Sequence, residues 1–298
     1  MRGNWFFLSY RNTETPKHRN TETPKHRHYP MASIPTWLRT FGIDPKRSIA
    51  SILGIRRYLR GRRQFRAQLG GDFLWGDALP ILDEWQAASG SLGAYFFQDQ
   101  RVAQWIYQDN PRRHVDVGSR LDGFIGHLSV FRQVDVLDLR PSPAAVGNVT
   151  FHQLDLMQDL PAAWIEATDS LSCLHSIEHF GLGRYGDAID VDGHRKGLAQ
   201  LQRMVAPGGL LYLSTPIGPQ RVEFNGHRVF AAATLAGWFA DGWEIERFAV
   251  IDDANRLLES VDWRGPELAT HFGCRTGLGI VVARKTRETQ GGKTRDAR

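Results

Sequence analysis

The chain has 298 residues, of which 42% are hydrophobic and 23% charged, and its formal net charge is +5. This composition is typical of a globular protein with one sizeable domain plus extensions. No apolar run approaches about 18 residues, so the sequence predicts no transmembrane segment. Two cysteines, Cys173 and Cys274, cannot form a disulfide framework. We therefore expect a cytoplasmic protein.

The first 30 residues contain an exact repeat. The octet RNTETPKH at residues 11–18 recurs at 19–26. A polar octet that contains proline has no apolar face to bury, so we expect residues 1–30 to form a disordered extension. Met31 begins a more ordinary sequence, and we expect the natural chain to start there.

Residues 31–110 are predicted to form a helical N-terminal region. Residues 47–69 combine hydrophobic residues at helical spacing with many arginines and no acidic residue. Such a basic helix could contact an anionic surface, or it could be a solvated helix at the edge of a domain. No clear nucleic-acid partner is indicated. The aromatic residues of a second helical stretch, 83–109, are typical of a core or a lid.

From 111 to 285 the pattern changes to short β-rich runs separated by helix-length segments. The predicted strands are 115–117, 134–139, 149–154, 170–175, 210–214, 243–251 and 278–283. A helix over 198–205 should end at the APGG sequence of residues 206–209. This alternation predicts an α/β fold with a doubly wound, mostly parallel, seven-stranded Rossmann-like sheet. Residues 286–298 are polar and basic, and we expect a disordered tail.

A glycine turn and an aspartate indicate a nucleoside site. Gly118 follows the first predicted strand, and Asp138 ends the second strand twenty residues later. This spacing accommodates a tight turn, one helix and a return strand, which places the carboxylate where it can accept hydrogen bonds from ribose hydroxyls. The alternative is an ordinary turn aspartate before Pro141.

The glycine turn also argues against a dinucleotide. Residues 118–123 are GSRLDG and lack the G-x-G-x-x-G spacing that a pyrophosphate favours. Arg120 and Leu121 crowd the path that bare backbone amides would otherwise offer. A cofactor without phosphates, such as S-adenosylmethionine, therefore suits this turn better than NAD.

The fourth predicted strand leads into HSIEHF at residues 175–180. The spacing His175-x-x-Glu178-His179 matches the inverted zincin motif, but that motif needs a helix that places both histidines on one face. Here it follows a strand and enters a glycine-rich run. The other interpretation places Glu178 and His179 at the strand's carboxyl end, facing the cofactor. We therefore predict no metal ion.

Together these features resemble the class I S-adenosylmethionine-dependent methyltransferases: a strand ending in Glu-His, a helix ending in APGG, and a strand running into STP at 214–216. More narrowly, three segments resemble the uncharacterised methyltransferase-like family called domain of unknown function 268. They are DVGS at 116–119, HSIEHFGLGRYGD at 175–187 and FNGHRVF at 224–230. The resemblance implies a methyltransferase domain over 111–285 with S-adenosylmethionine as cofactor.

Carried over by position, the resemblance assigns Asp116, Gly118 and Ser119 to the first cofactor motif. Asp138 takes the ribose position, and Asp155 lies near the adenine position.

Candidate catalytic groups follow the fourth and fifth strands. His175, His179 and His227 could deprotonate a substrate hydroxyl, with Glu178 beside them, since the pKa of an imidazole lies near neutrality. The candidate acceptor-binding residues are Arg184, Tyr185, Asn225 and Arg228, of which the two arginines could bind an anion. Alternatively, Glu178, His179 and Arg184 only hold the glycine-rich loop in place.

Two functions therefore remain open. The first is a methyltransferase acting on an unidentified small-molecule or sugar-type acceptor. The second is a catalytically degenerate methyltransferase fold that serves as a binding module. A nicotinamide oxidoreductase is disfavoured by the turn at 118–123.

Overall fold

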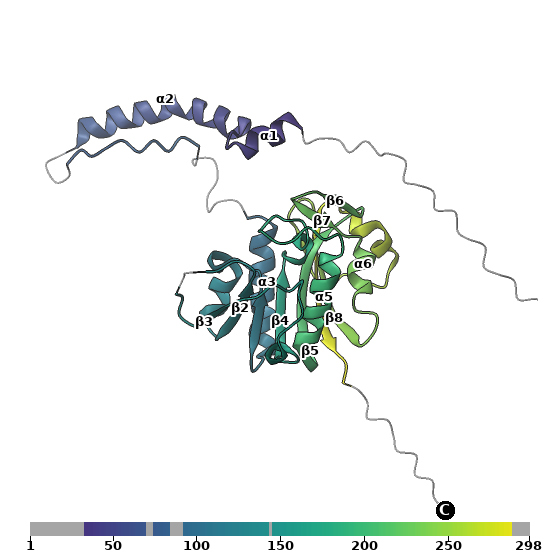
Figure 1. Ribbon diagram of the computed structural model, residues 1–298. Helices are drawn as coiled ribbons and strands as arrows, with labels where there is room; N and C mark the ends of the chain where they lie inside the picture. The colour runs from purple at the N-terminus through teal and green to yellow at the C-terminus, as the bar shows by residue number, and fades with distance from the viewer. Residues whose placement is uncertain (1–32, 70–73, 84–91, 143–144, 288–298) are drawn as a thin grey trace, which may run out of the picture. The chain divides into compact units, whose positions relative to one another are not determined.

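The structure is a computed structural model that describes residues 33–69, 74–83, 92–142 and 145–287 (Figure 1). The predicted extension 1–30, the start at Met31 and nearly all of the predicted tail lie outside these residues. The chain divides into two compact units, Met1–Gly90 and Ser91–Arg298. No helix in the described ranges is long and apolar enough to cross a membrane.

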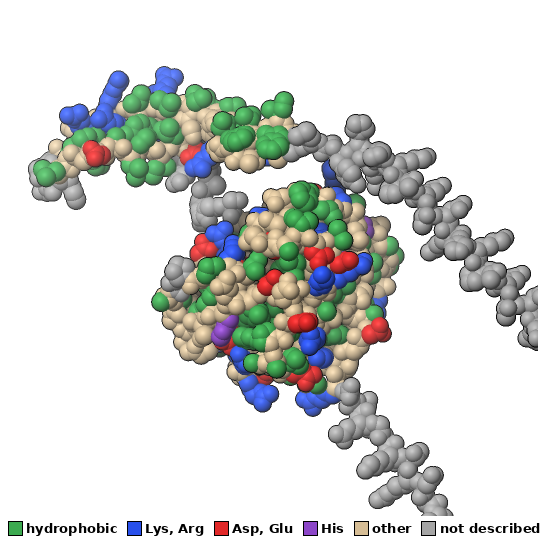
Figure 2. Space-filling model, viewed as in Figure 1, with side chains coloured by type: hydrophobic (Ala, Val, Ile, Leu, Met, Phe, Trp, Pro, Cys, Tyr) green, Lys and Arg blue, Asp and Glu red, His purple; other side chains and the backbone are tan. Residues whose placement is uncertain are grey.

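The first unit contains α1 (Ile34–Thr40) and α2 (Pro45–Gln68), which confirms the helix predicted over 47–69. The segment 74–83 returns along α2: the carbonyl oxygen of Leu82 lies only 1.9 Å from where a Cβ on Gly54 would be, so only glycine fits there. Trp75 lies under the guanidinium of Arg62 at 5.4 Å. Several hydrophobic side chains along α2 are exposed (Figure 2).

The division between the units falls before α3 (Ala94–Asp109), not at the predicted boundary of 110–111. Val102 and Ile106 of α3 are completely buried against the sheet, so this helix is part of the second unit. The change in pattern at Asn110 marks the end of a helix within the domain, because Asn110 adopts the left-handed conformation that terminates α3.

The second unit is built on one twisted sheet with strand order β3-β2-β1-β4-β5-β10-β8-β9. The strands are β1 (His114–Val117), β2 (Val134–Asp138), β3 (Val149–Gln153), β4 (Thr168–Leu174), β5 (Val205–Ile217), β8 (Trp243–Ile251), β9 (Leu257–Leu258) and β10 (Gly277–Lys285). The first five are parallel, whereas β10 pairs antiparallel with both β5 and β8. The mostly parallel α/β fold is thus confirmed.

Two details differ from the prediction. The sheet has eight strands, because the two-residue β9 pairs with the outer side of β8 and was too short to be recognised in the sequence. The APGG segment also lies inside β5, which begins at Val205 directly after α5 (Gly193–Met204). An irregularity in the β4–β5 pairing accommodates it, and Gly208 supplies a φ of +85°.

Helices cover both faces of the sheet. α3, the π-turn η1 (Leu121–Ile125) and α4 (Gly126–Ser129) pack on one face. α5 and α6 (Ala232–Gly237) pack on the other. Because both faces are covered, all four residues of β1 are buried.

The chain order reverses between β1 and β4, which makes their carboxyl ends the topological switch point of the sheet. Ligands of doubly wound folds bind at such a point. The 3-10 turn η3 (Ile177–His179) follows β4 there. The remaining short elements are η2 (Ala162–Trp164), η4 (Pro266–Gly273) and a separate hairpin formed by β6 (Arg221–Glu223) and β7 (His227–Val229).

Candidate functional site

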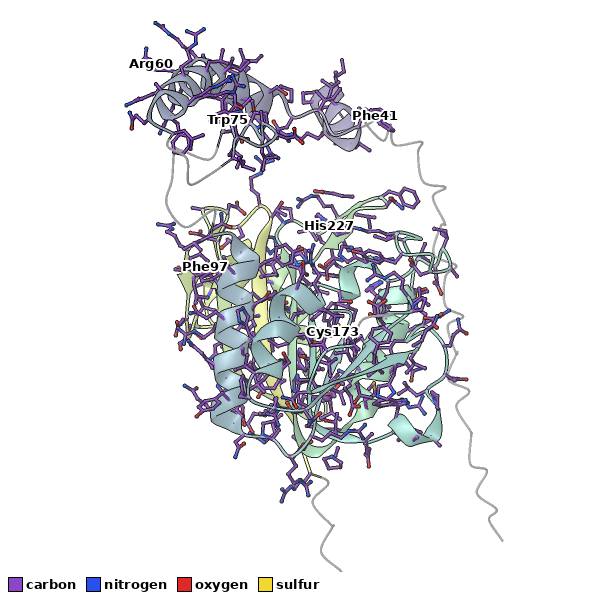
Figure 3. The ribbon with its side chains drawn as sticks, turned by 90° about the vertical axis from the view of Figure 1, so that its left-hand side faces the viewer. Phe41, Arg60, Trp75, Phe97, Cys173 and His227 are labelled. Carbon is purple, nitrogen blue, oxygen red and sulfur yellow. The ribbon has the colours of Figure 1, made fainter. Side chains whose placement is uncertain are left out.

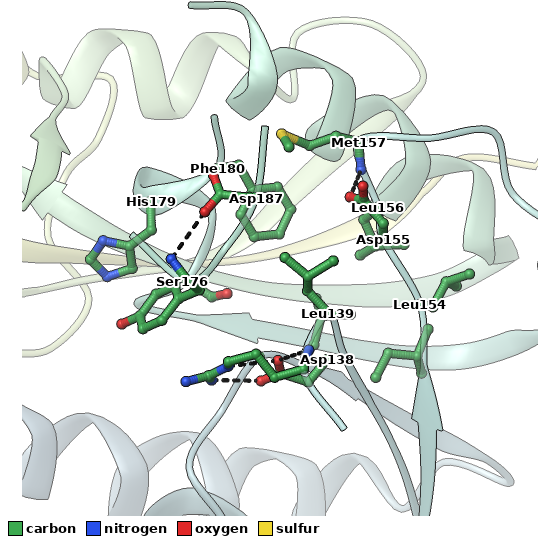
Figure 4. A pocket seen from close by; sticks show the side chains of 15 residues that line it. Asp138, Leu139, Leu154, Asp155, Leu156, Met157, Ser176, His179, Phe180 and Asp187 are labelled. Carbon is green, nitrogen blue, oxygen red and sulfur yellow. Dashed lines mark hydrogen bonds and ion pairs between the residues drawn. The ribbon is translucent and has the colours of Figure 1, made fainter. Parts of the chain in front are cut away.

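A pocket lies at the carboxyl ends of β1 to β4, with about 530 Å³ of empty space including its open mouth (Figure 4). Its apolar walls are Val117, Leu137, Leu139, Leu154, Leu156, Met157 and Phe180. Gly118 and a polar rim complete it, formed by Asp138, Arg140, Asp155, Ser176, His179, Tyr185 and Asp187. A mostly apolar slot with a few converging polar groups is typical of small-molecule sites.

Gly118 forms the turn at the base of this pocket. Its φ is +74°, and a Cβ on this residue would lie 2.2 Å from Oγ of Ser176. Its amide donates a hydrogen bond to the carbonyl of Leu137 at 2.9 Å. Only glycine allows the turn after β1 to approach the end of β4 this closely.

Asp116 and Ser119 hold this turn and do not line the pocket, although the sequence placed them among the cofactor-binding residues. Asp116 is completely buried and accepts hydrogen bonds from the amide and hydroxyl of Ser119 and from the hydroxyl of Ser172. Burial raises its pKa to about 7, against the opposing effect of these hydrogen bonds. Asp116 points away from the slot because Val115 and Val117, its neighbours along β1, occupy the opposite face.

Asp138 lines the pocket, but its carboxylate is already paired. The guanidinium of Arg140 donates to both carboxylate oxygens, from Nε to Oδ1 at 3.0 Å and from Nη2 to Oδ2 at 2.8 Å (Figure 4). The Arg140 amide also donates to Oδ1 at 2.8 Å. Asp138 therefore stabilises its own turn, which was the alternative in the sequence, and still faces the pocket.

Arg140 was missed by sequence reasoning. Its guanidinium lies 4.4 Å from the ring centroid of Tyr185, and Arg184 contacts the same ring at 5.1 Å. The only indication in the sequence was that a basic residue, Arg140, stands two positions after Asp138 and could pair with it.

Asp155 follows β3 and lies on the pocket rim. Its Oδ1 accepts a hydrogen bond from the amide of Met157 at 2.8 Å, which fixes the turn after the strand. Asp187, another missed residue, serves the glycine-rich loop. Its carboxylate accepts hydrogen bonds from the amides of Gly181, Gly183 and Tyr185.

The HSIEH segment folds into a compact cluster and not a helix. His175 adopts a left-handed conformation with φ +53°, and the single turn η3 follows. As a result, Nδ1 of His175 contacts Oε1 of Glu178, and Nε2 of His179 lies 3.7 Å from the same oxygen. Glu178 is completely buried. Tyr95 of α3, absent from the predicted site, packs its ring against His175 at 4.7 Å.

The β6–β7 hairpin closes over this cluster. Nδ1 of His179 lies 2.7 Å from the carbonyl oxygen of Gly226, and Arg184 donates to the same carbonyl at 2.9 Å. His227 lies on this hairpin (Figure 3), with its ring centroid 6.4 Å from that of His179. Burial lowers the pKa of both histidines, against the opposing effect of the nearby glutamates.

Two predicted acceptor-binding residues have structural contacts instead. Arg228 is buried, and its guanidinium donates to the backbone carbonyls of Glu178, Phe180, Asp190 and Val191. Asn225 forms the tip of the hairpin with φ +62° and donates to the carbonyl of Leu182 at 3.4 Å. Neither lines the pocket. Of the four predicted residues, only Tyr185 does, with Arg184 stacked on it.

The sheet order and the pocket at its switch point define a doubly wound α/β fold of the Rossmann-like type. Residues 149–262 match the family described as Caenorhabditis protein of unknown function, DUF268. The match covers less than half of the chain and includes two of the three segments that carried the resemblance, 175–187 and 224–230. It confirms that resemblance. No curated protein matches the sequence.

Three solved structures illustrate the structural likenesses. The N-methyltransferase NodS from Bradyrhizobium japonicum WM9, in complex with S-adenosylhomocysteine, is 13% identical; the match covers 68% of this chain and 92% of that one, with TM-score 0.44. The 1,6-didemethyltoxoflavin methyltransferase from Burkholderia thailandensis is 13% identical, with coverages of 87% and 93% and TM-score 0.43. The cyclase SpnF is 15% identical, with coverages of 62% and 81% and TM-score 0.43.

Proposed function

We propose that the pocket binds S-adenosylmethionine and that the protein is a methyltransferase for a small-molecule acceptor. The observation that carries this proposal is the position of Asp138. Its carboxylate stands at the end of β2, on the rim of an apolar slot and across from the glycine turn at Gly118. A carboxylate in this place can accept hydrogen bonds from the vicinal hydroxyls of a ribose.

The residues of the pocket suit an adenosine. Leu137, Leu156 and Met157 provide apolar surfaces for a base, and Asp155 lies beside them on the rim. Oδ2 of Asp138 accepts only one hydrogen bond from Arg140 and so keeps a lone pair for a hydroxyl. The side chains of Arg120 and Leu121 directly follow the turn, where a pyrophosphate would need free amides.

When bound, S-adenosylmethionine supplies an electrophilic methyl group on a sulfonium sulfur. The protein's part is to hold the acceptor in line with that group and to exclude water, because methyl transfer depends chiefly on positioning. His179 is the one histidine of the cluster that lines the pocket. Nδ1 of His179 is held by the carbonyl of Gly226, which fixes the imidazole as part of the pocket wall beside a bound acceptor.

The test is calorimetric titration of the full chain with S-adenosylmethionine, S-adenosylhomocysteine and NAD. We expect micromolar affinity for the first two and a loss of about tenfold or more in Asp138→Ala, since a charged hydrogen-bond acceptor is removed. Asp122→Ala, which removes an exposed carboxylate outside the pocket, is the matched control. A folded chain that binds neither sulfur compound, or that prefers NAD, would overturn the proposal.

Two finer points are also proposals. A sugar-type acceptor would present vicinal hydroxyls to the polar rim of the pocket, where Tyr185 lies. An anionic surface would suit α2, where arginines lie among exposed Ile52 and Leu53. Sedimentation of the full chain with anionic vesicles, but not with neutral ones, is the expected result.

A further inference from the structure

Three metal-ligand side chains meet at the end of β4. His175, Glu178 and His179 each offer one ligand atom, and these atoms all lie within 4.8 Å of one another. They form the only such group of three or more in the described part of the chain. The left-handed His175 and the turn η3 bring the ligands together without the helix on which the sequence-based exclusion of a metal depended.

Glu178 lacks the partners that a buried carboxylate needs. Its side chain is 0% exposed, and neither oxygen accepts a hydrogen bond of normal geometry. His175 Nδ1 pairs with Oε1, but Oε2 has no hydrogen-bond partner among the described residues. A buried carboxylate oxygen without a partner is costly, and a metal ion would satisfy it.

The orientation of His179 indicates what is missing. A carbonyl oxygen only accepts hydrogen bonds, so the contact with Gly226 places the proton of a neutral His179 on Nδ1. Nε2 then directs a lone pair toward the carboxylate of Glu178 at 3.7 Å. Two acceptors that face each other are held together by a proton or by a cation between them, and an ion there would be bound by both groups. An imidazole whose other nitrogen donates to a backbone carbonyl is the usual arrangement of a metal-binding histidine.

His227 lies beside this cluster on a different element, with its ring centroid 6.4 Å from that of His179. Its Nε2 is buried and has no hydrogen-bond partner, although Oε2 of Glu223 lies 3.4 Å away. His227 directly follows Gly226 in the β6–β7 hairpin. One hairpin therefore carries both Nε2 of His227 and the carbonyl oxygen of Gly226 that orients His179.

We propose that His175, Glu178 and His179 bind one divalent transition-metal ion, with Zn²⁺ as the representative and His227 beside the fourth position. Two imidazoles and a carboxylate form a recognised ligand set for catalytic zinc and for related ions with an open coordination position. Mg²⁺ favours oxygen ligands and does not suit this set.

The site would also narrow the acceptor class, a step that rests on the proposed methyltransferase function. His179 belongs both to the metal cluster and to the pocket wall, so an acceptor in the pocket lies next to the ion. Acceptors with a hydroxyl or carboxylate oxygen would gain a ligand bond there, and the charge of the ion would lower the pKa of a hydroxyl.

The experiment uses the untagged full chain, stripped with a chelator and titrated with Co²⁺ while its visible absorption is recorded. We expect one Co²⁺ per chain, with the absorption bands of an ion bound by nitrogen and oxygen. Zn²⁺ should displace it and a hundredfold excess of Mg²⁺ should not. A chain that keeps its circular dichroism spectrum and binds neither Co²⁺ nor Zn²⁺ would overturn the proposal.

Variants locate the ion. Glu178→Gln preserves the shape of the side chain and should weaken Co²⁺ binding by about 100-fold or more, and His175→Asn should do the same if Glu178→Gln does not fold. His127→Ala, on the exposed surface of α4, is the control. His18, His26 and His28 are other histidines of the full chain that could bind the ion, so the variants are needed to locate it. Co²⁺ binding that survives both the Glu178 and the His175 substitution contradicts the assignment. Titration of the stripped chain with S-adenosylhomocysteine separates failure of the metal site from failure of the proposed function.

Discussion

Arg140 stacks its guanidinium on the ring of Tyr185, at 4.4 Å, while it pairs with both carboxylate oxygens of Asp138. The residue in the ribose position is therefore joined to the glycine-rich loop after β4 by a single arginine. The Arg140 side chain therefore crosses the rim of the pocket. A ribose hydroxyl that binds Asp138 must compete with this guanidinium, so the strength of the ion pair affects the affinity for the ligand.

Arg140→Ala should increase affinity for S-adenosylhomocysteine by about fivefold, because a half-exposed ion pair contributes about 1 kcal/mol or less and competes with the ribose. Calorimetry on the variant and the parent chain measures the difference. Arg120→Ala is a close control, since Arg120 pairs with an aspartate two residues away outside the main pocket. A decrease in affinity would show that Arg140 contacts the cofactor directly.

Tyr185→Leu should weaken S-adenosylhomocysteine binding by about fivefold, whereas Tyr185→Phe should leave it unchanged. Tyr185 lines the pocket, and its aromatic ring, which phenylalanine keeps and leucine lacks, provides contact surface there; about 1 kcal/mol of lost contact corresponds to about fivefold in affinity. Fluorescence-detected titration of the three proteins would reveal the pattern. Equal losses in both variants would assign the effect to the hydroxyl.

Asp116→Asn should change how stability depends on pH. The pKa of Asp116 is raised from 3.8 to about 7 in the folded chain, so the folded form keeps a proton that the unfolded form has lost. The stabilisation is complete below about pH 4 and is lost as pH rises through 7, by up to about 4 kcal/mol. Asparagine does not titrate, so the stability of Asp116→Asn should not fall in this way as pH rises.

Urea denaturation between pH 5 and 8 should therefore show the variant gaining stability relative to the parent chain as pH rises. Asp122→Asn, at an exposed position with a lowered pKa, should not show this gain. A constant difference between parent and Asp116→Asn over this range would contradict the raised pKa.

Arg228→Met should destabilise the fold by about 3 kcal/mol, because several backbone carbonyls in the loop from Glu178 to Val191 lose a charged donor. Chemical denaturation gives the free energy of unfolding. Arg184→Met, at an exposed position with one backbone hydrogen bond, should cost about 0.5 kcal/mol or less. Similar costs for the two variants would argue against a structural role specific to Arg228.

Local sequence determined the parts of the site that depend on short distances along the chain. The spacing from Gly118 to Asp138 predicted the pocket rim correctly, because one turn, one helical segment and one return strand fix the separation of two neighbouring parallel strands. The strands themselves were recognisable from their apolar runs, since parallel strands are buried on both faces.

The contacts that close the site could not be predicted in this way. Arg228 was assigned to substrate because it follows the fifth predicted strand and a guanidinium can bind an anion, yet its partners lie 37 to 50 residues away. No sequence signal marks His175 as left-handed, so the cluster with Glu178 was not foreseen. The pairing of Arg140 with Tyr185 likewise depends on how two separate loops meet.

Gly118 and Ser176 also have a consequence for the evolution of this chain. Because the Ser176 hydroxyl fills the space of the missing Cβ, a side chain at 118 is tolerated only after 176 has become smaller and the backbone of the turn has relaxed. Substitutions at the two positions must therefore occur in one order, and the reverse order passes through a damaged intermediate. Among related sequences, residues 118 and 176 should covary even though 57 residues separate them.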